Sequence, residues 1–228
     1  MSLQMEQEVL DQNLILEESF KLNQILKDNG VHTDKLYKPE KQITKQDCHR
    51  CSPREVKTDF ACPESGARIS VKAHSTVELC SVGMLQFCDY LDVSFDRLGY
   101  AMSESQSFKE SLLIQPKRLY GDEERDEWNQ TSKVNLNNML KSMMTMYPEL
   151  KRELVKTAML GDGIFEGDAI PTHIATPEKF VPITREYIDK VTDAVKIEIR
   201  LKGRSKIKGT NIRQREPSFR IGLNMKSL

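Results

Sequence analysis

Three polar residues on two neighbouring segments have the types and spacing that metal-assisted chemistry uses. Residues 55–74 form two short runs of alternating apolar and polar residues around a turn rich in Pro, Ser and Gly, which predicts a β-hairpin. In such a hairpin Asp59, Ser70 and Lys72 project from the same side. A carboxylate placed there can bind a hard divalent cation, and a nearby Lys can orient an attacking water or stabilise charge developing on a phosphate.

Helices are predicted on both sides of this hairpin. Residues 6–28 carry a broad apolar side and end at Asn29-Gly30, and residues 76–90 are apolar after a Ser or Thr that can cap a helix. The order of helix, strand with Asp59, strand with Ser70-x-Lys72 and helix resembles the core of the PD-(D/E)XK nuclease superfamily. That core has a helix, a strand ending in Asp, a hairpin strand bearing Glu-x-Lys, and a second helix. The resemblance covers roughly residues 6–90.

The resemblance implies a restriction-endonuclease-like core and a Mg²⁺-dependent nuclease of a phage or mobile-element type. Asp59 would bind the metal, Lys72 would assist the attacking water, and Ser70 stands where the second acid is expected. Some members with Ser-x-Lys take the missing carboxylate from the following helix, where this chain has Glu78. Glu18, or its neighbour Glu17, would supply a further acid from the first helix. Without these carboxylates the fold would survive and metal catalysis would not.

The chain has no net charge, yet its charges are unevenly distributed. From Lys196 to the end, ten Lys or Arg side chains accompany two acidic ones, so this segment carries +8 and residues 1–195 carry −8. Alternating residues predict an antiparallel hairpin over 195–224, with strands near 195–202 and 217–224. Its basic connection is expected to be mobile and to bind phosphates of a nucleic acid, with DNA favoured, through Arg204, Lys206, Lys208, Arg213 and Arg215. The alternative is a solvated loop that improves solubility.

A noncatalytic function is the competing interpretation. The same fold would then serve a nucleic-acid-binding or phage assembly protein, with the basic hairpin and the Met-rich helix 134–146 contacting partners. A second copy of the chain or another phage protein would be such a partner. Cys48 and Cys51 have the spacing of half a zinc site, but no second close pair follows. Free thiols are therefore favoured over structural zinc.

Length and composition set the fold class. The 228 residues suit a single domain spanning 1–228, and helices around a set of mixed strands predict an α/β or α+β fold with a central mixed sheet and flanking helices. Further helices are expected over residues 148–160 and 185–194. No apolar run approaches the length of a membrane helix, and the first 30 residues are polar, unlike a signal peptide. These features predict a cytoplasmic protein, in the host cytoplasm if phage-encoded, with no membrane partner.

Overall fold

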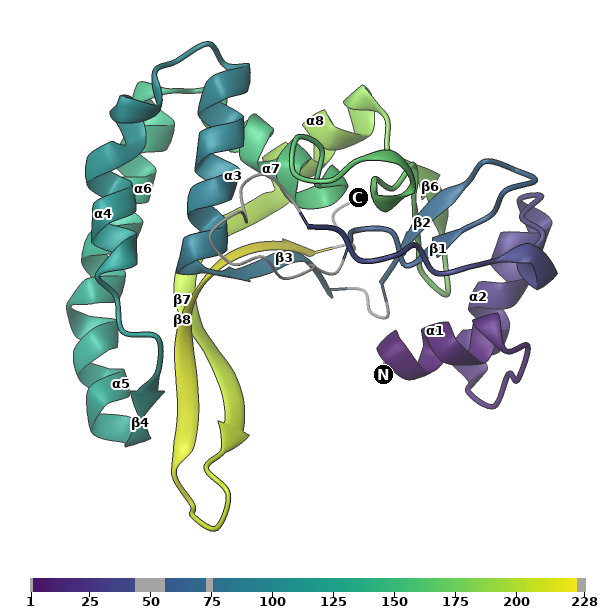
Figure 1. The fold of residues 1–228 in the computed structure, drawn as a ribbon, viewed down its shortest axis with the longest axis horizontal. Helices are drawn as coiled ribbons and strands as arrows, with labels where there is room; N and C mark the ends of the chain where they lie inside the picture. Colours follow the sequence, from purple (N-terminus) through teal and green to yellow (C-terminus); the bar gives the residue numbers. More distant parts are fainter. Residues whose placement is uncertain (1, 44–55, 73–75, 225–228) are drawn as a thin grey trace. The chain divides into compact units, whose positions relative to one another are not determined.

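A computed structural model describes residues 2–43, 56–72 and 76–224 of the chain (Figure 1). Contacts within it define two compact units. The first contains the described residues up to Val77 and Met159–Asp193, and the second contains Glu78–Ala158 and Ala194–Leu223. Both combine helices and strands, which confirms the predicted mixed fold class. Whether the chain folds as a single domain stays a prediction. None of the described helices is long and apolar enough to cross a membrane.

The first unit contains a mixed sheet with the strand order β1-β2-β5-β6. β1 pairs antiparallel with β2, β2 runs parallel to β5, and β5 is antiparallel to β6. The predicted N-terminal hairpin is confirmed by the first of these pairs. The helices of this unit are α1, α2 and α8, with short 3₁₀ turns η1 and η4 between elements. The bounds are α1 Ser2–Leu10, α2 Glu17–Asp28, η1 Thr33–Lys35, β1 Phe60–Ala61, β2 Arg68–Val71, η4 Gly167–Ala169, β5 His173–Ala175, β6 Phe180–Pro182 and α8 Arg185–Ala194.

One face of this sheet and helices α1 and α2 share an apolar core. Phe60 and Ile69 of the hairpin are fully buried there together with Val9, Leu22 and Leu26 of the two helices. Burial of these side chains is the main term that stabilises the unit, at about 25 cal/mol per Å² of apolar surface. The hairpin is therefore held through one face, and its other face is left for polar residues.

The single helix predicted over residues 6–28 is wrong, because two helices occupy this region. α1 ends at Leu10, and Gln12 has a positive φ of 56°, which a helix does not contain. The Glu8 carboxylate accepts backbone N–H groups of Ile15 and Leu16 at 3.1 and 2.8 Å. These hydrogen bonds satisfy donors at the start of α2 and stabilise the break, which apolar periodicity alone does not reveal.

The second unit is built on the long strand β8, which pairs with β7 and also with β3 and β4. Helices α3 to α6 and most of α7 complete this unit, and α6 covers the predicted Met-rich helix 134–146. The helix predicted over 148–160 corresponds to α7. The bounds are β3 Thr76–Gly83, α3 Met84–Arg97, η3 Met102–Ser105, α4 Gln106–Leu113, β4 Leu119–Tyr120, α5 Gly121–Gln130, α6 Ser132–Met146, α7 Leu150–Leu160, β7 Val195–Lys206 and β8 Arg213–Asn224.

The helix predicted over 76–90 is wrong in its first half. Residues 76–83 form strand β3, and α3 begins only at Met84 after Gly83. Leu79 and Cys80 are both buried, so the strand is covered on both sides at this point. A short apolar run of this kind has the same periodicity as a buried helix segment, and pairing with β8 decides in favour of the strand.

The C-terminal hairpin is confirmed, and it is longer than predicted. β7 and β8 pair from Val195↔Leu223 to Lys206↔Arg213, with an irregularity between Gly203 and Lys206. The connection predicted over 203–215 is therefore mostly strand, and only residues 207–212 form the turn. This turn is closed by the Ile207 N–H donating to the Ile212 carbonyl at 3.0 Å. The expectation of an unanchored loop is corrected accordingly.

The described cysteines are thiols. Cys62, Cys80 and Cys88 are buried and are not in disulfides, while Cys48 and Cys51, which have the spacing of half a zinc site, lie outside the described residues. Burial, with the nearby Asp92 carboxylate as a second cause, raises the pKa of the Cys88 thiol to about 12.

We expect Cys88 to resist alkylation by iodoacetamide at pH 8 in the folded protein, because the reactive thiolate is both scarce and buried. Mass spectrometry of peptides from folded and urea-unfolded samples measures the labelled fraction. The unfolded sample is the control and should be fully labelled. Rapid labelling of Cys88 in the folded protein would contradict its environment in α3.

Candidate functional site

The polar face of the first hairpin brings three predicted residues together. The β1–β2 register places Asp59 opposite Ser70, and the Asp59 N–H donates to the Ile69 carbonyl at 2.8 Å. The Asp59 Oδ2 accepts the Val71 N–H at 2.6 Å and lies 3.4 Å from the Ser70 hydroxyl, which donates to it. Because side chains alternate along a strand, Lys72 follows Ser70 on the same face.

The Asp59 carboxylate lies in a partly buried, charged environment. Burial raises the pKa of Asp59 above its usual value, although Lys72, the Val71 N–H, Lys38 and the Ser70 hydroxyl each act to lower it. The Lys72 ammonium is thus within electrostatic reach of the carboxylate. A carboxylate that is desolvated and lies near two cations is a candidate functional group, because solvated surface acids lack the desolvation.

A small cavity of about 60 Å³ opens beside Asp59. Glu6 of α1 lines it with its side chain almost fully buried, and the Lys38 ammonium lies 3.9 Å from the Glu6 carboxylate. The Thr58 hydroxyl also lines the cavity, is buried, and has no hydrogen-bond partner among the described residues. The lining residues are Leu3, Glu6, Lys38, Pro39, Lys41, Val56, Thr58 and Asp59.

Sequence reasoning missed Glu6. The helix predicted over residues 6–28 begins at this residue, whereas α1 begins at Ser2. A signal was present, because Met5 and Val9 are apolar with helical spacing and identify the buried side of α1 next to Glu6. An acidic residue at the edge of a buried helix face is uncommon and indicates a specific environment.

The two other acids proposed as metal ligands are not brought to Asp59 by the described contacts. Glu18 lies on α2, where its charge acts on Lys21, and it is not among the residues that line the Asp59 cavity. Glu78 lies in strand β3 of the second unit and not at the start of a helix, and its side chain is outside the described part of the structure. The prediction that Glu78 begins a helix is therefore wrong, because Glu78 lies in a strand.

The donors at the cavity have the chemistry that a hard cation requires. Asp59, Glu6 and Thr58 offer oxygen atoms, and Mg²⁺ is commonly bound through one or two carboxylates with water completing its shell. Within the described ranges, no three His, Cys, Asp or Glu side chains gather into a group that would hold a metal ion. The protein donors found here thus amount to two carboxylates and a hydroxyl, with Lys38 competing for Glu6.

The segment after α7 packs against the same hairpin. The Lys57 N–H donates to the Ala169 carbonyl at 3.2 Å, and the Thr172 N–H donates to the Arg68 carbonyl at 2.7 Å. Gly161 begins the segment with φ of +65°, and an added Cβ there would approach the Lys57 side chain to 2.8 Å. The absence of a side chain at Gly161 allows the loop to lie close to Lys57, just before strand β1.

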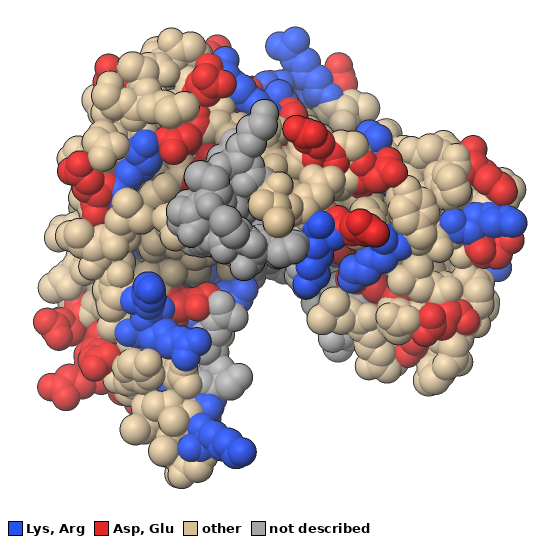
Figure 2. All heavy atoms as spheres, viewed as in Figure 1, with Lys and Arg blue, Asp and Glu red and all other residues tan. Residues whose placement is uncertain are grey.

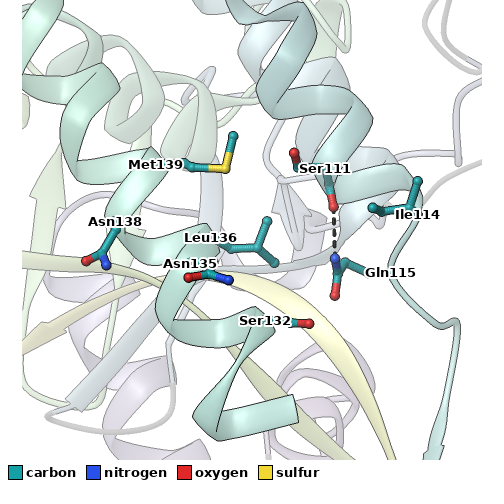
Figure 3. A pocket seen from close by; sticks show the side chains of 8 residues that line it. All are labelled: Ser111, Ile114, Gln115, Ser132, Asn135, Leu136, Asn138 and Met139. Carbon is teal, nitrogen blue, oxygen red and sulfur yellow. Dashed lines mark hydrogen bonds between the residues drawn. The ribbon is translucent and has the colours of Figure 1, made fainter.

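A larger cavity, of about 570 Å³, lies in the second unit between the end of α4 and helix α6 (Figure 3). Its lining consists of neutral residues: Ser111, Ile114, Gln115, Ser132, Asn135, Leu136, Asn138 and Met139. Gln115 is already engaged, since it donates to the Ser111 carbonyl and accepts the Trp128 indole N–H, both at 2.9 Å. Without a titratable side chain in its lining, this cavity is not suited to acid–base chemistry.

The predicted phosphate-binding residues fall into two environments. Lys206, Lys208 and Arg213 are exposed at the end of the β7–β8 hairpin. Arg215 is half-buried farther along β8, where its charge helps to lower the pKa of Asp126, after the larger effect of Arg125. The Arg204 side chain lies outside the described part. Arg215 is therefore set apart from the exposed residues, because it is half-buried and its charge also acts on an acid of its own unit.

No family model matches the chain, and no curated protein or solved structure shows significant similarity to it. The functional argument therefore depends on the geometry of the described residues.

Proposed function

We propose that the protein is a metal-dependent nuclease whose centre is the polar face of the β1–β2 hairpin. The observation that carries this proposal is the meeting of Asp59, Ser70 and the charge of Lys72 beside a cavity lined by a second buried carboxylate, Glu6. The order of helix, Asp59 with β1, and β2 with Ser70-x-Lys72 resembles that of the PD-(D/E)XK superfamily, although Asp59 comes directly before β1 and not at the end of a strand. Strand β3 replaces the helix expected next, so the proposed resemblance covers a shorter part of the chain.

Each residue has a distinct proposed role. Asp59 and Glu6 would hold a divalent cation, which supplies charge stabilisation for a phosphodiester. The Lys72 ammonium would hydrogen-bond to the attacking water and to the phosphate oxygens, favouring negative charge as it develops there. Ser70 and the Val71 N–H would fix the orientation of the Asp59 carboxylate. Glu6 takes the place that the sequence interpretation gave to Glu18 and Glu78.

A noncatalytic nucleic-acid-binding protein is the second candidate. The observation that favours it is that two carboxylates near a lysine can also form a buried ion-pair network. In that case Asp59 and Glu6 would have a structural role and no metal would be needed. The two candidates differ in what Asp59 does for stability. A structural ion pair stabilises the fold, whereas a carboxylate whose pKa is raised by burial costs stability when ionised.

The substitution Asp59→Asn tests the proposal. We expect it to abolish Mg²⁺-dependent cleavage of plasmid and single-stranded DNA, with a loss of about 100-fold or more, since a metal ligand and its charge are removed. Asp193→Asn, an exposed acid on α8, is the matched control and should cleave normally. Wild-type protein without metal-dependent cleavage of either DNA or RNA would overturn the nuclease proposal.

The same variant should be more stable than the wild type at pH 7. In the wild type the folded-state pKa of Asp59 is raised, so the folded protein binds the Asp59 proton more tightly than the unfolded chain does. The ionised group therefore costs stability above that pKa, and the cost disappears below the unfolded value of about 3.9. Urea midpoints of Asp59→Asn and wild type should differ at pH 7 and converge toward pH 4. A lower midpoint for the variant at pH 7 would favour the structural ion pair.

A further inference from the structure

The end of the β7–β8 hairpin is an exposed two-stranded ribbon with a single sign of charge. The ribbon tip, defined here as Lys206–Arg213, contains Lys206, Lys208 and Arg213 and no acidic residue. All of its residues except Ile207 are exposed. β4 pairs with β8 only at Arg215 and Gln214, so the tip extends past the last cross-strand partner on that side (Figure 1).

The ribbon tip is ordered by its own hydrogen bonds. The Thr210 N–H donates to the Ile207 carbonyl at 3.0 Å, and the Thr210 hydroxyl accepts the Ile212 N–H at 3.2 Å. The Lys206 ammonium donates to the Asn211 side-chain oxygen at 3.1 Å. Gly209 has φ of +81° and open space around it, which allows the tight reversal. A tip closed in this way presents its side chains without a large ordering cost on binding.

Its surroundings direct an anionic partner to the ribbon tip. Helix α5 is strongly acidic, with Asp122, Glu123, Glu124, Asp126 and Glu127. Figure 2 shows Lys and Arg side chains along the ribbon, while acidic side chains gather over the neighbouring region of α5 and β4. A polyanion is repelled from α5 and attracted to the tip.

We propose that the ribbon tip inserts into the major groove of duplex DNA. This inference identifies duplex DNA as the substrate of the proposed nuclease and rests on that proposed function. Two strands about 4.8 Å apart, with their side chains, match a groove about 12 Å wide, and the tip's reach of roughly 10 Å matches its depth of about 8.5 Å. Lys206, Lys208 and Arg213 contact phosphates, and Thr210 and Asn211 lie at the turn, where they face base edges.

The composition of the ribbon tip argues against other nucleic acids. Residues 203–213 contain no Phe, Tyr or Trp, and proteins that bind single strands stack bases on aromatic side chains. The major groove of duplex RNA is deep and too narrow for side chains to read, so a ribbon of this width is excluded from it. Duplex DNA is the nucleic acid that fits both the width and the chemistry of the tip.

The test measures binding without cleavage. Asp59→Asn protein in EDTA is titrated into fluorescein-labelled duplex DNA, the corresponding single strand and a duplex RNA of the same sequence, and anisotropy is recorded between about 50 and 200 mM salt. We expect duplex DNA to bind at least about tenfold more tightly than the other two. The triple substitution Lys206→Gln, Lys208→Gln and Arg213→Gln should flatten the salt slope by about 2.7, at roughly 0.9 per phosphate.

A matched control keeps the result specific to the ribbon tip. Lys133→Gln, Lys141→Gln and Lys151→Gln remove the same charge from helices α6 and α7 of the same unit and should leave the slope unchanged. Equal or tighter binding of single strands or RNA would overturn the inference, as would a tip variant with unchanged affinity and salt slope. Failure of the nuclease proposal would give a different result: cleavage would be absent, but DNA binding would still depend on the ribbon tip.

Discussion

Replacing Lys72 with methionine is expected to lower the rate of metal-dependent DNA cleavage by about 100-fold or more while the protein stays folded. Groups that transfer protons or stabilise charge in a transition state typically contribute factors of about 10² to 10⁴. Methionine preserves most of the apolar stem of the lysine and removes only the ammonium. Single-turnover rates with enzyme in excess separate this chemical effect from weaker DNA binding.

The pH dependence of the Lys72→Met variant gives a second readout. Lys72 is the strongest of the groups that lower the pKa of Asp59, so its removal should raise that pKa further. The acidic limb of any residual activity should then move to higher pH. Lys179→Met, an exposed lysine of the same unit, is the control and should change neither rate nor profile. Full activity in Lys72→Met would contradict the proposed role of Lys72 in cleavage.

Replacing Phe219 with alanine is expected to destabilise the second unit by about 3–5 kcal/mol, the usual cost of removing a buried aromatic side chain. Phe219 is fully buried on β8 and stacks on Phe87 of α3, with ring centroids 3.7 Å apart and an angle of 6° between the rings. Phe87 in turn contacts Phe108 of α4 edge to face. The truncation therefore leaves a cavity where a strand and two helices meet.

Urea unfolding monitored by circular dichroism measures the effect of Phe219→Ala. Ile212→Ala is the control, because Ile212 is 44% exposed in the hairpin turn and surface changes usually stay within about 0.5 kcal/mol. Alkylation of Cys88, next to Phe87 on α3, should become faster in the Phe219 variant as local opening increases. A midpoint equal to that of the wild type would contradict the packing of β8 on α3.

The elements with strong local signals could be predicted from the sequence. Alternation located both hairpins, and the helix predicted over 185–194 matches α8, which the Thr184 hydroxyl caps by accepting the Tyr187 N–H at 3.1 Å. Asp59 and Ser70 lie on one face because register and strand periodicity together decide their orientation. These features depend on a few consecutive residues, so a sequence contains the information directly.

The rest depended on contacts that are distant in sequence. Whether residues 76–83 form a strand or a helix is decided by β8, more than 130 positions later. The break after Leu10 depends on a single carboxylate, Glu8, reaching two backbone N–H groups. Glu6 reaches the Asp59 cavity only because α1 and the hairpin share one core. No short motif encodes such relations.

The parallel pairing of β2 with β5 also has a consequence for how the chain acquires its structure during synthesis. Ile69 pairs with His173, and between them in the sequence lies most of the second unit. A ribosome must release about a hundred further residues before the sheet of the first unit can gain its third strand. Until then the β1–β2 hairpin has an open edge that can pair with other strands. The residues of the hairpin around Asp59 are therefore synthesised early, whereas the strand that covers the open edge of β2 is synthesised late.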